Sequence, residues 1–348
     1  MQPKQRKLQI LAAIIESYAE TGEPMGSKTL AQLFDNTVSS ATLRNDMAAL
    51  AESGYLHQPH TSAGRVPTQR GYRLYVDRLM NQRSLPEELM QYIDVSLTGY
   101  SMNPDGFLSS AVKMLSSMTG LTAIATTPTS DDAVITGIEL MPTGQYTCLM
   151  MVIISPAILK TRICRTDIEL TPELIGAISS LLHQTLCGRR LSEINRRYMT
   201  AIREQLGPIG ESLEPLLSAA RDAAAEGAAA KVMLDGQAAL LNKNAFSDTG
   251  LRGILTFFSD SERMSALVSS ARAPLTVFIG DESGIDELSE ASMILARYHS
   301  GGGASGCVGV IGPTRMNYSR NISYIEYFAT AVGRLMSSLE TDEPESQQ

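Results

Sequence analysis

The chain has 348 residues, of which 43% are hydrophobic and 19% are charged. This composition excludes a disordered or fibrous protein, and the length allows two or three domains that each bury a core. The formal net charge of −8 argues against a protein that coats nucleic acid without regard to sequence.

The charge is unevenly distributed along the chain. Residues 1–80 contain nine Lys or Arg against seven Asp or Glu, a net charge of +2, whereas residues 81–348 carry −10. Only the N-terminal segment is therefore electrostatically suited to DNA.

The cysteines are far apart in the sequence and form no Cys-x-x-Cys pair: Cys148, Cys164, Cys187 and Cys307. This spacing argues against a zinc site and indicates reduced thiols in a cytoplasmic protein, and we expect no cofactor. No uninterrupted apolar stretch has the length of a membrane span. Glu16 and Glu20 interrupt the apolar N-terminal segment, which is not typical of a signal peptide.

Helices are predicted at the start of the chain, in segment 1–53. The first carries an apolar stripe at helical spacing and ends at Gly22 and Pro24. The stripe consists of Leu8, Leu11, Ile14, Ile15 and Tyr18. Ser27 is a suitable N-cap for a short second helix, and residues 35–37, Asp-Asn-Thr, are typical of a turn.

A third helix is predicted to begin at Ser39 or Ser40, either of which can cap it, and to end at Gly54. Its apolar residues share one face: Leu43, Met47 and Leu50. Its polar residues point elsewhere: Thr42, Arg44, Asn45 and Asp46. Taken alone, this is an ordinary amphipathic helix with a solvated polar face. The segment that follows it favours a DNA-recognition helix instead.

Residues 55–59 and 65–67 have strand character and flank a short polar loop, in which Gly64 allows a positive φ. Taken alone, this is equally a plain surface hairpin. Helix, helix, turn, helix, hairpin is, however, the order of a winged helix-turn-helix, which reads the major groove with its third helix. Its hairpin follows the backbone or the minor groove. We therefore predict these DNA contacts: Ser27, Lys28, Ser39, Ser40, Thr42, Arg44, Asn45, Thr61, Ser62, Gly64 and Arg65.

The run SSATLRNDMAALAESGYLHQPHTSAGRVPTQRGYRLYV, with GEPMGSKTLA before it, resembles the signature of the bacterial heat-inducible transcription repressor HrcA family. The dense part of the resemblance covers Gly22 to Leu79, and the order of the later segments fits more loosely. The resemblance implies a homodimeric repressor that binds an inverted-repeat operator ahead of chaperone genes and depends on the chaperonin GroEL. One departure is LLNKNAFSD at residues 240–248, where relatives tend to have Pro-Glu-Phe.

Thr68 is predicted to cap a fourth helix with Arg70 and Arg73 on its polar side. Two interpretations of that basic side remain open. It either touches DNA, or it contains an ordinary ion pair between Arg73 and Asp77 at i, i+4 spacing.

After a linker at 81–86, the chain is predicted to be helical to residue 120 and then rich in strands separated by Pro and Gly. A hairpin turn is predicted at 141–145, a helix at 172–186, and a C-terminal helix capped by Asn321. These segments predict an antiparallel sheet flanked by helices, and thus an α+β fold. The resemblance to HrcA implies that this sheet domain is GAF-like.

Residues 191–272 are predicted to be mainly helical and to interrupt the sheet, and the resemblance implies that they form an inserted dimerising domain. Their apolar residues are either surface for a partner chain or core packed on the sheet: Ile254, Leu255, Phe257, Phe258, Met264, Leu267 and Val268. The expected organisation is a winged helix-turn-helix domain at 1–82, a GAF-like domain at 87–190 and 273–340, the insertion at 191–272, and a disordered tail at 341–348.

The sequence contains no motif that supports an enzyme. The glycine-rich run at 299–313 lacks the Gly-Lys-Ser/Thr ending of a phosphate loop, and the acidic run at 281–290 reads as a solvated turn without a partner nucleophile. The order of the N-terminal elements indicates a DNA-binding protein, and the resemblance to HrcA implies that it is a transcriptional repressor. Two rivals remain: a winged-helix regulator that senses a small molecule through the sheet domain, and a winged-helix module that binds protein or RNA.

Overall fold

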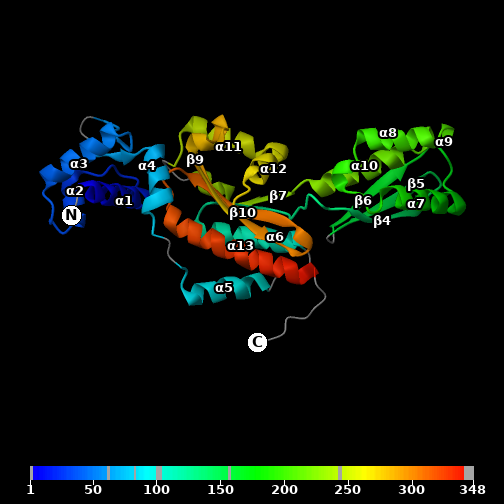
Figure 1. The fold of residues 1–348 in the computed structure, drawn as a ribbon, viewed down its shortest axis with the longest axis horizontal. Helices are drawn as coiled ribbons and strands as arrows, with labels where there is room; N and C mark the ends of the chain where they lie inside the picture. The colour runs from blue at the N-terminus through cyan, green and yellow to red at the C-terminus, as the bar shows by residue number, and fades with distance from the viewer. Residues whose placement is uncertain are drawn as a thin grey trace.

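The computed structural model describes residues 3–60, 63–81, 84–98, 104–155, 158–241 and 245–340. Figure 1 shows an elongated molecule with a small helical module at the N-terminal end, a sheet with helices in the middle, and a smaller sheet module at the far end. Helices and antiparallel strands both contribute, so the expected α+β fold class is confirmed. Among the described helices, none is long and apolar enough to cross a membrane.

The N-terminal module packs its helices around one apolar cluster. Its elements are α1 (Pro3–Thr21), α2 (Ser27–Leu33), α3 (Ser40–Glu52), β1 (Leu56–His57), β2 (Val66–Pro67) and α4 (Gln69–Leu74), which continues as a π-helical turn over Tyr75–Leu79. The apolar stripes predicted on the first and third helices face each other, because Ile14 and Ile15 of α1 are buried in the same cluster as Leu43 and Met47 of α3. Burial of these stripes orients α3 and leaves its opposite side to solvent.

The middle of the molecule is an antiparallel sheet with the strand order β7-β3-β10-β9-β8, which we call the central sheet. In that order its strands are Val232–Asp235, Thr122–Thr126, Ser305–Pro313, Ala291–His299 and Leu275–Ile279. Successive residues of β9 alternate between two clusters: Ile294 packs with α6 (Pro104–Thr119) and α13 (Tyr318–Glu340), whereas Leu295 packs with α11 (Asp248–Phe258) and α12 (Ser261–Ser270). Both faces are therefore covered by helices, as Figure 1 shows, and α5 (Glu87–Thr98) lies against α13.

The far module is built on a separate antiparallel sheet, β4-β5-β6, which we call the distal sheet. Its strands are β4 (Ile135–Gly144), β5 (Thr147–Ile154) and β6 (Ile158–Arg165), and its helices are α7 (Pro172–Leu186), α8 (Arg196–Gln205), α9 (Pro208–Ser212) and α10 (Glu214–Ala228). These elements share a core of their own. Because β3 and β7 are neighbours in the central sheet, the module is inserted between them.

This packing corrects two sequence expectations. The strands at 135–165 were expected in the same sheet as the later strands, but they form the distal sheet, and the core of the inserted module lies within 133–224. The apolar residues considered for a partner surface are mostly core: Ile254, Phe257 and Met264 are buried against Met293 and Leu295 of the central sheet. Helices α11 and α12 therefore belong to the central sheet's packing, and the interpretation as dimer surface is wrong for their buried residues, whereas Leu255 is 41% exposed.

The N-terminal module is joined to the central sheet through α4. Arg73 donates from Nε to Oε1 of Glu282 at 2.9 Å and from Nη2 to the carbonyl of Val277 at 2.6 Å. It also forms the i, i+4 pair with Asp77 at 3.2 Å. Its carboxylate partners raise the pKa of Arg73, and the largest contribution comes from the hydrogen bond that Arg73 donates to Glu282. Of the two interpretations of the basic side of α4, the contacts of Arg73 support the ion pair. The acidic run at 281–290 is not purely a solvated turn, because Glu282 binds Arg73.

Candidate nucleic-acid interface

The turn between α2 and α3 is made by two residues in the left-handed backbone region, Asp35 at φ 48° and Asn36 at φ 54°. Asp and Asn tolerate this region better than other residues with side chains. The amide of Asn36 donates to the carbonyl of Ala31 at 2.8 Å, and the hydroxyl of Thr37 donates to the carbonyl of Phe34 at 2.7 Å. The predicted turn is therefore confirmed, and it fixes the angle at which α3 leaves α2.

Ser39 is the N-cap of α3. Its Oγ accepts a hydrogen bond from the amide of Thr42 at 3.2 Å and lies 2.9 Å from Oγ1 of the same residue. This settles the choice between Ser39 and Ser40, which occupies the first helical position and is exposed. The hydroxyls of Ser39 and Thr42 are thus engaged with each other, while that of Ser40 faces solvent.

The solvent side of α3 carries Ser40, Arg44 and Asn45, all exposed, whereas Thr42 is half-buried. Ser40 and Arg44 are four residues apart and so lie one above the other on the helix. Asp46, which we expected away from the apolar face, is buried and accepts a hydrogen bond from Nε of Arg6 at 2.7 Å. This pair withdraws a negative charge from the exposed side of α3, on which Arg44 and Glu52 remain as exposed charged residues.

The hairpin after α3 is anchored to the segment before α2. Leu56 pairs with Pro67 and His57 with Val66, and beyond them the backbones of Met25 and Arg65 exchange hydrogen bonds of 3.0 and 2.8 Å. Gly64 does not have a positive φ, so that part of the sequence interpretation is wrong. A Cβ at this position would lie 2.2 Å from the carbonyl oxygen of Met25. The glycine is needed because the two backbones meet there.

The sequence reasoning missed the residue that closes the hairpin loop. Nε2 of Gln58 donates to the carbonyl of Ala63 at 2.9 Å across the loop. A glutamine at the end of a two-residue strand gives no signal of such a contact in the sequence. The predicted contacts Thr61 and Ser62 lie at the loop tip, outside the residues that the structure describes.

Four of the predicted contact residues, from three separate segments, line one hollow of roughly 420 Å³ on this module, and Ser39, Ser40, Thr42 and Asn45 lie outside its lining. Ser27 comes from α2, Arg44 from α3, and Gly64 and Arg65 from the base of the hairpin. Nε of Arg65 is buried and has no hydrogen-bond partner among the described residues. Lys28 is exposed on α2 but is not part of the lining. The hollow is therefore bordered by two guanidinium groups that come together only in the folded module.

A small helical module with exposed basic and hydroxyl side chains, joined to a larger body of two sheets, is the organisation expected of a transcription regulator. Comparison with known proteins gives the family. The family model described as HrcA protein C terminal domain matches residues 105–322. The heat-inducible transcription repressor HrcA of Acetivibrio thermocellus is 32% identical over 327 residues, covering 93% of this chain and 93% of the relative. The protein of the same name from Symbiobacterium thermophilum is 32% identical and covers 95% of this chain and 98% of its own. The chain belongs to the HrcA family of heat-inducible transcription repressors.

A solved structure supports the arrangement of the whole chain. The crystal structure of a hypothetical protein at 2.2 Å resolution superposes with a TM-score of 0.59 at 23% sequence identity, covering 96% of this chain and 98% of the other. This likeness concerns the fold alone. It indicates that the order of N-terminal module, central sheet and inserted distal module occurs in another protein.

Proposed function

We propose that the protein represses heat-shock genes by binding an inverted-repeat operator in duplex DNA as a homodimer. The observation that carries this proposal is the hollow of the N-terminal module, where Ser27, Arg44 and Arg65 converge from three segments. The arrangement supports a winged helix-turn-helix in which α3 enters the major groove and the hairpin is the wing. Membership of the HrcA family supports repression of chaperone genes.

The exposed side of α3 has the chemistry of base readout. Arg44 can donate two hydrogen bonds to guanine, and Asn45 can donate to and accept from adenine. Ser27, Lys28 and Ser40 are placed for phosphate, because they stand at or near helix N-termini where backbone amides are free. Ser39 and Thr42 then contribute by holding the start of α3 in place. At the wing we propose contacts from Thr61, Ser62, Gly64 and Arg65.

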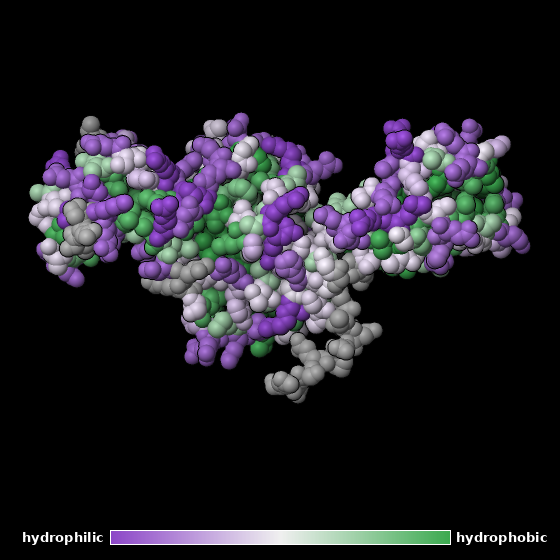
Figure 2. Space-filling model, viewed as in Figure 1, coloured by the Kyte–Doolittle hydropathy of each residue, from purple (hydrophilic) through white to green (hydrophobic). Residues whose placement is uncertain are grey.

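The distal sheet offers the surface for the second copy. Its inner side is buried under α7 and α10, but its outer side carries a cross-strand cluster of apolar residues. The cluster consists of Met141, Leu149, Met151, Ile153, Leu159 and Ile163, of which Ile163 is 81% exposed and Leu159 is 57% exposed. Figure 2 shows hydrophobic residues at the surface of this module. Apolar patches of this kind mark protein interfaces, and a two-fold dimer fits an inverted repeat.

The central sheet with its helices is the part that we propose to be GAF-like, and the distal module is the inserted dimerising domain. We further propose that the chaperonin GroEL returns the heat-opened chain to its DNA-binding state in the cytoplasm. Recovery of operator binding after thermal unfolding, measured with and without chaperonin, tests this step. Equal recovery in both arms contradicts it.

A gel-shift titration of the full chain tests the main proposal. The probes are a duplex with an inverted repeat taken from upstream of a chaperone gene, the same duplex with one half-site scrambled, and a single-stranded RNA of matched length. We expect one dimer per intact repeat, weaker binding to the scrambled duplex, and an affinity that falls as salt rises. A chain that prefers RNA, or binds random duplex equally well, is not this repressor.

A further inference from the structure

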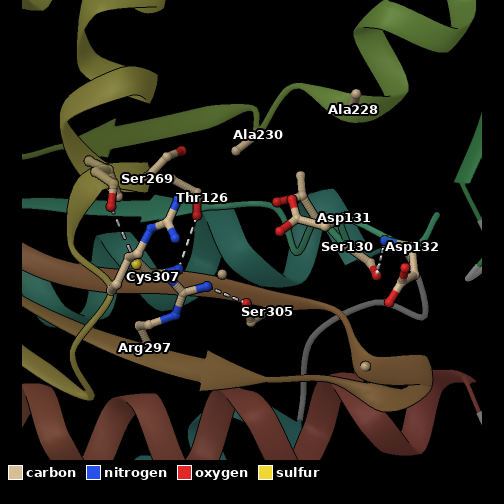
Figure 3. Close-up of a pocket in the computed structure, with 15 residues that line it drawn as sticks. Thr126, Ser130, Asp131, Asp132, Ala228, Ala230, Ser269, Arg297, Ser305 and Cys307 are labelled. Carbon is tan, nitrogen blue, oxygen red and sulfur yellow. Dashed lines mark hydrogen bonds between the residues drawn. The ribbon is translucent and has the colours of Figure 1, made fainter. Parts of the chain in front are cut away.

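A polar cavity of roughly 680 Å³ lies where the inserted module joins the central sheet. Both connecting segments line it: residues 129–132, which lead from β3 into the module, and residues 228–230, which lead back from α10 to β7. The opposite wall comes from the central sheet and the end of α12. Figure 3 shows Ser130, Asp131 and Asp132 across the cavity from Arg297 and Cys307. The cavity belongs neither to the N-terminal hollow nor to the apolar side of the distal sheet.

The sheet wall of the cavity is positively charged and partly fixed in position. Arg297 is half-buried, and it donates from Nη1 to the carbonyl of Ala271 at 3.2 Å and from Nη2 to Oγ of Ser305. Arg272 also lines the cavity, is exposed, and has no ion-pair or hydrogen-bond partner among the described residues. The guanidinium group matches the geometry of a phosphate through paired hydrogen bonds, so two arginines on one wall are suited to bind one.

The linker wall is of opposite character. Asp132 is exposed and pairs with Arg190 at 3.0 Å, while Asp131 is exposed and has no ion-pair partner among the described residues. Hydroxyl groups complete the lining between the two walls: Thr126, Thr129, Ser130, Ser269 and Ser305. A solvent-filled gap between modules does not require charges sorted by sign onto facing walls. This sorting points to a ligand with an anionic end and a hydrogen-bond-donating end.

The residue types in the lining restrict the chemical class of the ligand further. None of the described residues that line the cavity is aromatic, so no ring is available to stack on a nucleobase. Most ligand pockets are largely apolar, and a lining of hydroxyl, carboxylate and guanidinium groups suits a ligand that is polar throughout. We propose that the cavity binds a small polyhydroxylated phosphate monoester, with the phosphate on Arg272 and Arg297 and hydroxyl groups on Asp131 and the neighbouring serines. A sugar phosphate has this chemistry and is small enough to enter the cavity.

A ligand held by both walls fixes the angle between the distal module and the central sheet. If the distal modules pair two chains, this angle sets the distance between the two N-terminal modules. Ligand binding then changes the affinity for the operator. That consequence rests on the proposed function. The binding of the ligand does not, and it is measured on the chain without DNA.

Isothermal titration calorimetry on the full chain tests the proposal with pentose and hexose phosphates, the corresponding free sugars, and inorganic phosphate. We expect saturable binding of a sugar phosphate and binding of its free sugar and of inorganic phosphate that is weaker by roughly tenfold or more. Arg272→Gln should weaken sugar-phosphate binding roughly ten- to a hundredfold, since it removes hydrogen bonds to a charged group. Arg252→Gln, which removes an exposed arginine on α11 outside the cavity, should leave it unchanged.

Asp131→Asn distinguishes the contribution of the sugar hydroxyl groups to binding from that of the phosphate. It should weaken sugar-phosphate binding and leave inorganic-phosphate binding unaffected or slightly stronger, because only the sugar phosphate has sugar hydroxyl groups that reach Asp131 when its phosphate is bound by the two arginines. The proposal is overturned if no sugar phosphate binds, if inorganic phosphate binds as tightly as every sugar phosphate, or if Arg272→Gln binds like the unmodified chain. Arg272 is exposed and has no hydrogen-bond or ion-pair partner among the described residues, so loss of binding in that variant does not reflect misfolding.

Discussion

Arg6 and Asp46 are 40 residues apart in the sequence, and Nε of the arginine donates to Oδ2 of the carboxylate at 2.7 Å in the N-terminal module. Asp46 is only 6% exposed, on the side of α3 that faces α1. The hydrogen bond with Asp46 raises the pKa of Arg6. A buried carboxylate that lost this partner would lack compensation for its desolvation. The pair therefore holds the predicted recognition helix at a fixed position on the first helix.

Replacing Arg6 by Gln should lower the thermal unfolding midpoint of the protein, because Asp46 is left buried without a cation. Lys4→Gln is the matched control, since it removes the same charge from an exposed position of the same helix. Differential scanning calorimetry compares the two variants. Equal midpoints for Arg6→Gln and Lys4→Gln contradict a structural role for the pair.

Arg44→Ala should weaken operator binding by roughly 1–3 kcal/mol and relax discrimination at one base pair per half-site, as expected for loss of an arginine that contacts guanine. Fluorescence anisotropy with the intact operator and with single-base variants measures both effects. The control is Arg78→Ala, which removes an exposed arginine of the same module far from the hollow lining. If the Arg44 and Arg78 variants bind the operator equally well, α3 is not part of the DNA interface.

Local features of the N-terminal module could be predicted from the sequence because neighbouring residues determine them. The turn at Asp35 and Asn36, the cap at Ser39 and the cap of α4 by Thr68 are all present in the structure. Contacts between distant segments could not be predicted, and Arg6 with Asp46 is an example. Alternation of apolar residues shows that a strand has a buried face but not which sheet it joins, so the distal sheet was merged with the central one.

The ends of helices and strands were predicted less well, because more than one nearby residue could cap a helix or form a turn. The sequence suggested Asn321 as the cap of the last helix, but the helix begins at Tyr318 and Oδ1 of Asn317 accepts from the amide of Arg320 at 3.0 Å. The turn expected at 141–145 lies later, because Met141 and Pro142 pair with β5. Pro142 is tolerated because β4 is an edge strand, where a missing amide hydrogen need not break the ladder.

Gly64→Ala should destabilise the wing and, with it, operator binding. The new Cβ meets the backbone of Met25 and Pro24, which cannot turn away as a side chain can, so a cost of about 1–3 kcal/mol is expected. Gly176→Ala in α7 tests the opposite case, since its Cβ would enter open space. This substitution should raise the free energy of unfolding by roughly 0.5–1 kcal/mol. Urea unfolding measures both. A Gly64 variant as stable as the unmodified chain shows that the two backbones are free to separate.

Ile163→Lys on the distal sheet should convert the proposed dimer to monomers. Each copy loses an apolar contact worth about 1.5–3 kcal/mol, and the two copies together weaken dimerisation roughly a hundredfold or more. Val95→Lys is the control, because this residue is 72% exposed on α5, away from the distal sheet. Sedimentation velocity gives the oligomeric state. A dimer that persists in Ile163→Lys and dissociates in Val95→Lys moves the interface to the helices under the central sheet.

Glu287 and Arg263 predict how stability depends on pH. Nη1 and Nη2 of Arg263 donate to the two carboxylate oxygens at 2.8 and 3.1 Å, and these bonds lower the pKa of Glu287 from its ordinary value of 4.5. Because the pKa is lower in the folded state, the stabilisation is complete above pH 4.5 and is lost as pH falls through the folded-state pKa. Glu287→Gln should therefore lower the thermal midpoint near neutral pH and match the unmodified chain at strongly acidic pH.

The matched control for this pair is Glu204→Gln, which alters an exposed carboxylate on α8. Thermal scans of the three chains from pH 7 downward give the comparison. The difference between Glu287→Gln and the unmodified chain should shrink steadily below pH 4.5, whereas the Glu204 variant should follow the unmodified chain throughout. A difference that is constant with pH means that the glutamate stabilises by packing alone. In that case its ion pair with Arg263 does not hold α12 to the segment before β9.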